Sequence, residues 1–129
     1  MSKKTREYDL ENRLINFAVS IIDIVEALPN TRAAKHIAGQ LVRSGTSPAP
    51  NYGEAQSAES RKDFIHKLSI VLKELRETEI CLKIINRSKS SNDSASASQL
   101  ISECRQLVAI FQKSINTAKT NNKKMKPPI

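Results

Sequence analysis

Apolar residues recur at intervals of three and four along most of this chain, and that period constrains the fold more than any other feature. The repeats predict four helices, which extend over 9–28, from Thr31 to a glycine- and proline-rich joint, from Ser60 to Ile85, and from 92–98 to Ala118. Only three glycines and no tryptophan occur in 129 residues, a composition that favours helices over sheets. We therefore predict an all-α fold, an antiparallel up-down four-helix bundle that buries all four apolar stripes.

The second helix carries an interruption near Gly45–Pro50. The two prolines of this stretch donate no backbone N–H, so a helix that passes through it loses two hydrogen bonds and bends. Alternatively, Thr46 or Ser47 caps a new helix for which Pro48 supplies the first residue. The sequence thus predicts a second helix that is kinked or broken, with Gly45 at the joint.

The basic residues concentrate at the two ends of the chain, whose net charge is +8. Residues 1–8 are expected to form a basic N-terminal arm, 9–118 the bundle, and 119–129 a basic, disordered tail. Seven basic residues against one acidic residue give these ends a charge of +6. The body is nearly balanced, so charge alone argues weakly for a nucleic-acid ligand.

The sequence lacks the residues that several classes of function need. No apolar run reaches the ~18 residues that span a bilayer and no secretory signal is present, so a cytoplasmic protein without a membrane partner is expected. Cys81 and Cys104 lie in apolar helical patterns and are expected in the core without a disulfide. His36 and His66 have no ligands at a convincing spacing, and no phosphate-binding glycine-rich loop is present. We expect no enzyme, no metal and no cofactor.

A polar stripe follows the joint of the second helix. Ser47, Asn51 and Glu54 are spaced by three and four residues, so a helix would place them on one face. We expect a structural seam in which Arg43 or Arg76 pairs with a partly buried Glu54, and in which loss of Asn51 or Glu54 costs about 1–4 kcal/mol. The competing interpretation is an open ligand or phosphate site, where alanine would weaken binding and leave stability unchanged.

The segment Leu41–Thr78 resembles a bacterial four-helix-bundle family, the proteins encoded in intervening sequences of 23S ribosomal RNA genes. The family motif R-x-x-x-S-x-x-x-N-x-x-E-A falls on Arg43, Ser47, Asn51, Glu54 and Ala55, followed by Asp63, Phe64, Lys67, Leu68 and the acidic Glu74. The polar members of this motif, which we expect to be structural, are Arg43, Ser47, Asn51, Glu54 and Glu74. The resemblance implies an antiparallel four-helix bundle that assembles into a ring, most often a homopentamer.

The chain is also similar in fold to the accessory variability determinant of diversity-generating retroelements. That pentamer has a basic surface that contacts nucleic acid and a reverse transcriptase. The similarity implies RNA or DNA as a ligand, and a reverse transcriptase or another protein as a partner, by analogy of fold and charge.

Five apolar residues lie off the main helical stripes and exceed what a four-helix core needs: Val19, Ile22, Ile70, Ile80 and Ile84. Exposed apolar groups on such a protein indicate an interface, so we expect a homo-oligomer. The expected function is low-specificity binding of structured RNA or DNA through the basic surface and tails. The candidate residues are Lys3, Lys4, Arg6, Arg61, Lys62, Lys67, Lys73, Arg76, Lys123, Lys124 and Lys126. The alternative is a protein-interaction scaffold that binds no nucleic acid.

Overall fold

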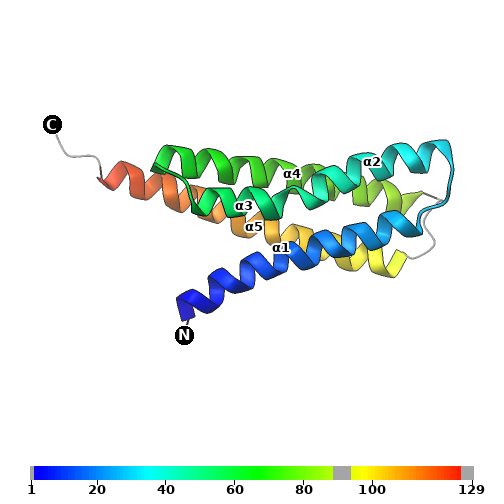
Figure 1. Cartoon of the computed structure of the whole chain (residues 1–129), viewed down its shortest axis with the longest axis horizontal. Helices are drawn as coiled ribbons and strands as arrows, with labels where there is room; N and C mark the ends of the chain where they lie inside the picture. Colours follow the sequence, from blue (N-terminus) through cyan, green and yellow to red (C-terminus); the bar gives the residue numbers. More distant parts are fainter. Residues whose placement is uncertain (1, 89–93, 126–129) are drawn as a thin grey trace.

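The computed structural model describes residues 2–88 and 94–125, with side chains at 9–88 and 95–121. Its helices are α1 (Ser2–Ala27), α2 (Arg32–Thr46), α3 (Pro48–Gln56), α4 (Arg61–Arg87) and α5 (Ser94–Met125). Figure 1 shows them packed lengthwise, with α2 and α3 end to end as one bent rod. The predicted all-α, antiparallel four-helix bundle with an interrupted second helix is confirmed.

Two helix starts follow from local sequence. The hydroxyl of Thr31 accepts a hydrogen bond from the backbone N–H of Ala34 at 3.2 Å, which caps α2. The hydroxyl of Ser60 accepts one from the N–H of Asp63 at 3.0 Å, which caps α4, and Asp63 places a negative charge in the first turn. Both caps lie at the predicted residues.

The interruption of the second helix lies at Ser47, which separates α2 from α3. Ser47 keeps right-handed helical dihedrals (φ −69°, ψ −36°), and its N–H still donates to the carbonyl of Arg43 at 3.2 Å. The rod is therefore continuous through Ser47, and it bends because Pro48 and Pro50 cannot donate the next backbone hydrogen bonds. The break falls within the predicted stretch Gly45–Pro50, and Gly45 itself lies in α2, two residues before the break, with no positive φ.

The glycine instead lets α1 and α2 approach each other. A Cβ built at Gly45 would lie 2.7 Å from the Cγ1 atom of Ile21, a fully buried residue of α1. Gly39, earlier on the same helix, has nothing within 4 Å of such a Cβ. Glycine is required at position 45 because α1 and α2 pack closely there, and not because the backbone needs a conformation that only glycine adopts.

The helix ends extend beyond the prediction. The first helix begins at Ser2 instead of near Asp9, so the expected arm at 1–8 is helical from its second residue. The last helix continues to Met125, so the expected disordered tail is helical over 119–125. Neither extension contains glycine or proline, and each residue added to an existing helix gains a backbone hydrogen bond. Residues 89–93 of the predicted connector, and 126–129 of the tail, lie outside the described residues.

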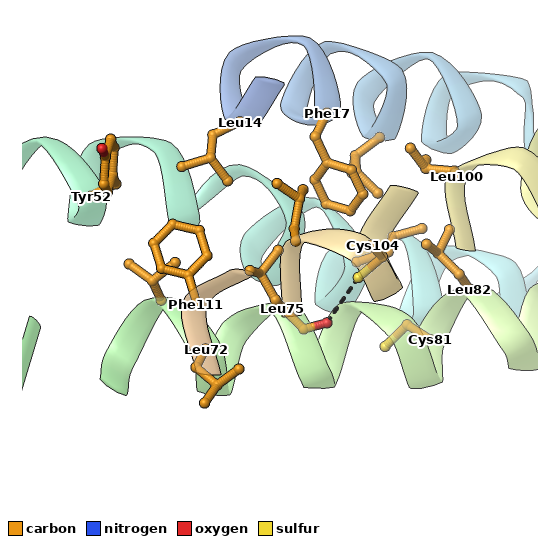
Figure 2. Packing of buried hydrophobic residues seen from close by; sticks show 14 of the residues in the cluster. Leu14, Phe17, Tyr52, Leu72, Leu75, Cys81, Leu82, Leu100, Cys104 and Phe111 are labelled. Atoms are coloured by element: carbon orange, nitrogen blue, oxygen red, sulfur yellow. Dashed lines mark hydrogen bonds between the residues drawn. The ribbon is translucent and has the colours of Figure 1, made fainter. Parts of the chain in front are cut away.

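One apolar cluster forms the core of the bundle, and Figure 2 shows part of it. Its fully buried members include Leu14 and Phe17 of α1, Leu75 of α4, and Leu107 and Phe111 of α5. The α1 and α4 helices occupy opposite corners, and no Cα atoms of their described residues lie within 8 Å of each other. No described helix is long and apolar enough to cross a membrane.

Candidate functional site

Two members of the polar motif, Ser47 and Asn51, are joined by hydrogen bonds at the break between α2 and α3. The side-chain amide of Asn51 donates to the hydroxyl of Ser47 at 2.7 Å and to its carbonyl at 2.9 Å. Both residues are half-buried. They share one face, as the spacing predicts, and their bonds lie where prolines have removed two backbone donors.

Arg43 joins α2 to α4. Its guanidinium donates to Glu77 and lies 3.5 Å from the carboxylate of Glu74, whose side chain is only 9% exposed. Beneath this pair, the hydroxyls of Ser44 and Thr78 are hydrogen-bonded at 2.9 Å and fully buried. Glu77 and Thr78 were not among the site residues predicted from the sequence, because their contacts depend on how α2 and α4 align.

The predicted partner of Glu54 is wrong. Its side chain is 60% exposed and accepts a hydrogen bond from the ammonium of Lys67 at 2.8 Å, instead of pairing with Arg43 or Arg76. Arg76 donates to Gln112 on α5 at 3.0 Å. Lys67 lies on the side of α4 that faces α3, so it reaches Glu54 across the α3–α4 turn. The hydrogen bond to Glu54 raises the pKa of Lys67.

Another ion pair, absent from the sequence prediction, links α1 to α5. Arg13 donates two parallel bonds to Glu103, at 2.8 and 3.0 Å. The hydrogen bond to Glu103 raises the pKa of Arg13, so the guanidinium stays charged. It borders a groove of about 310 Å³ between the two helices, where Asn16 and Gln99 contribute polar walls.

No group of three or more potential metal ligands is found in the described part of the chain. Burial raises the pKa of the Cys104 thiol to about 12, and its sulfur donates to the carbonyl of Leu75 at 3.1 Å. Cys81 is also buried and free. Thiols in this setting are core groups without nucleophilic character.

The basic candidates separate into two groups. The start of α4, the N-terminus of α1 and the C-terminus of α5 lie at the same end of the bundle, which we call the basic end (Figure 1). It carries the candidate positions Lys3, Lys4, Arg6, Arg61, Lys62, Lys67, Lys123 and Lys124. Lys73 and Arg76 lie farther along α4, away from this end, and Lys126 lies outside the described residues.

The basic end has a hollowed surface. Arg61 and Lys113 line a groove of about 310 Å³, and Phe64 and Ser114 connect it to a neighbouring hollow of about 470 Å³. The floor of that hollow includes Tyr52, whose ring meets Phe111 edge-on with centroids 5.6 Å apart. Lys113 was not among the sequence candidates, although antiparallel pairing of α4 with α5 places it beside Arg61. Cations around a concave surface can contact phosphate groups.

Comparison with known proteins agrees with this architecture. The model of the 23S rRNA-intervening sequence protein family matches residues 6–113. A crystal structure of a protein of unknown function from Bacteroides thetaiotaomicron, assigned to the S23 ribosomal protein family, is 31% identical in sequence, with a TM-score of 0.75. The similarity covers 82% of this chain and 97% of that one. No curated protein matches the chain. On this evidence, the chain belongs to the 23S rRNA-intervening sequence protein family.

Proposed function

We propose that this protein is a non-enzymatic, cytoplasmic homo-oligomer that binds structured RNA or DNA with low sequence specificity through its basic end. The observation that carries the proposal is the convergence of three separate basic segments, from α1, α4 and α5, on one end of the bundle. The family resemblance implies five copies. In a closed ring, the basic ends of all the copies would add to one larger charged surface.

The chemistry of this surface favours phosphate over bases. Lys and Arg at the basic end can contact phosphate oxygens, which position a nucleic acid without reading its sequence. The aromatic rings of Tyr52 and Phe111 are buried, so neither offers an open face for stacking. Double-stranded RNA is recognised mainly through shape and backbone, and the family name, which refers to 23S rRNA, makes an RNA hairpin the first ligand to test.

A fluorescence anisotropy titration tests this function. A labelled RNA hairpin and a DNA duplex are titrated with protein at 50 and 200 mM NaCl. Because each neutralised phosphate releases counterions, the logarithm of affinity should fall with the logarithm of salt, with a slope of about −0.9 per contact on duplex DNA. The double variant Lys62→Ala, Lys113→Ala should weaken binding and reduce the slope by about 2.

The matched control is Arg32→Ala, Lys35→Ala, which removes the same charge from the start of α2, at the opposite end of the bundle. It should bind as the wild type does. Equal loss in both variants would show nonspecific attraction to net charge. Absence of binding at 50 mM NaCl would reject the nucleic-acid function.

The alternative is a protein-interaction scaffold, and exposed isoleucine and valine side chains on α1 and α4 support it. By analogy with the accessory variability determinant, a reverse transcriptase is the protein partner to test. Apolar association changes little between 50 and 200 mM NaCl, so salt dependence separates it from phosphate binding.

A further inference from the structure

Large apolar side chains are exposed in two groups at opposite corners of the bundle. Ile15, Val19 and Ile22 lie on the outer face of α1, and Ile80 and Ile84 on the outer face of α4. Their exposed fractions range from 43% to 61%. Four of these residues were expected from the sequence. Ile15 was not, and the fifth expected residue, Ile70, is half-buried.

The α1 group lies between two carboxylates. Glu11 precedes Ile15 by four residues and Glu26 follows Ile22 by four, so all lie on one face of the helix. Both carboxylates are exposed, and neither forms an ion pair within the described side chains. Arg13, the one basic residue of α1 with a described side chain, is bound to Glu103 of α5. We call this surface the acidic face.

The α4 group lies between two cations. Lys73 and Arg87 lie seven residues before and after Ile80, so they share its side of the helix, and both are exposed. Neither forms an ion pair within the described side chains. The carboxylates of α4 nearby are already paired, Glu77 with Arg43 and Glu79 with Lys83. We call this surface the basic face.

The two faces also match in length. At 1.5 Å per residue, Glu11 and Glu26 are about 22 Å apart along α1, and Lys73 and Arg87 about 21 Å apart along α4. The apolar residues lie between the charges in both cases. Beside Ile84, a small apolar groove of about 110 Å³, lined by Leu28 and Ile37 among others, could receive a side chain from a partner.

We propose that the acidic face of one copy docks on the basic face of the next copy. Apolar residues meet at the centre, and carboxylates meet cations on both sides. Because the two faces differ and lie on opposite corners, the contact is head-to-tail: a pair of copies leaves one face of each kind free, and assembly continues until a ring closes. The inference rests on the homo-oligomer of the proposed function and assigns its surfaces. It also places Lys73 at a subunit contact and not on nucleic acid.

Charge reversal tests the proposal by sedimentation velocity at 1–100 µM protein. Glu11→Lys, Glu26→Lys makes both faces basic, and Lys73→Glu, Arg87→Glu makes both acidic. Each variant alone should sediment as monomer, with subunit affinity weakened about tenfold or more. A mixture of the two should restore association, since each contact between unlike variants joins opposite charges, and a five-membered ring would keep one contact between like variants. The matched control Lys62→Glu, Lys113→Glu, at the basic end, should assemble as the wild type does.

The outcomes separate this contact from the wider proposal. A wild-type oligomer that persists in both charge variants would overturn the assigned faces and leave the homo-oligomer intact. A wild-type protein that is monomeric at 100 µM would overturn both. Circular dichroism confirms that each variant is folded. For a variant that fails to fold, Val19→Ser and Ile80→Ser replace it, and retained assembly in both would equally reject the proposal. Nucleic-acid titrations of the same variants report the binding function separately.

Discussion

The two sides of α4 are packed by different chemistry. Toward α5, the contact is mainly apolar: Leu107 and Phe111 are fully buried, and the thiol of Cys104 donates to the backbone carbonyl of Leu75 (Figure 2). The hydrogen bonds of Arg76 and Arg105 lie at the exposed edge of this contact. Toward α2, buried hydroxyls and a nearly buried carboxylate meet. An apolar contact tolerates sliding as long as area stays buried, whereas a buried hydrogen bond is satisfied at only one alignment. We infer that the α5 side supplies stability and the α2 side sets the position of the helices.

The largest effect is expected on the α5 side. Leu107→Ala removes a fully buried side chain and leaves a cavity, so it should reduce the free energy of unfolding by about 2–5 kcal/mol. Urea unfolding followed by circular dichroism measures the loss. Lys113→Ala, at an exposed position of the same helix, serves as the control and should change stability by less than about 0.5 kcal/mol. A loss below about 1 kcal/mol at Leu107 would show that this side of α4 is not the main source of stability.

The next effect concerns the close approach of α1 and α2. Gly45→Ala places a methyl group 2.7 Å from buried Ile21 and should destabilise by about 1–3 kcal/mol in spite of the higher helix propensity of alanine. Gly39→Ala makes the same change on the same helix where space is open, so it should stabilise by roughly 0.5–1 kcal/mol. Opposite signs in thermal melts confirm the packing argument. Stabilisation by both substitutions would contradict it.

The α2 side itself is tested by its buried hydroxyl pair. Thr78→Val keeps the shape of the side chain and removes the bond between the helices, so the hydroxyl of Ser44 keeps only a long bond of 3.5 Å to the carbonyl of Leu41, at a cost of about 1–2 kcal/mol. Adding Ser44→Ala removes this poorly satisfied group, so the double variant should be more stable than Thr78→Val alone. Chemical denaturation of the four proteins yields the coupling energy. Simple additivity of the two losses would show that the bond does not join the helices.

The smallest effect is expected at Glu54. Its carboxylate is 60% exposed and pairs with Lys67 at the surface, so Glu54→Ala should change stability by no more than about 0.5 kcal/mol. Thermal melts in low and high salt measure it. This small expected change in stability replaces the loss of about 1–4 kcal/mol that the sequence analysis predicted for Glu54. A loss above about 2 kcal/mol would restore the structural role first assigned to Glu54.

The starts of α2 and α4 were predictable because they depend on neighbours in the chain. Thr31 and Ser60 cap helices through residues three positions later, which a single sequence displays. The outer ends of α1 and α5 were less predictable: residues 2–8 and 119–125 contain no helix breaker, but they were assigned to a basic arm and a disordered tail. Cys81 and Cys104 were correctly assigned to the core because they follow the apolar period.

The sequence alone determined the number of rods, their apolar stripes and the place of the bend, because period, caps and prolines act within a few residues. Tertiary structure alone decided which polar groups meet. Glu54 pairs with Lys67, Arg43 pairs with Glu74 and Glu77, and Arg13 pairs with Glu103, which is 90 residues away in the sequence. The physical reason is the helical period. Successive side chains point in directions about 100° apart around the helix axis, so a small shift or rotation between two packed helices brings a different pair of side chains within reach.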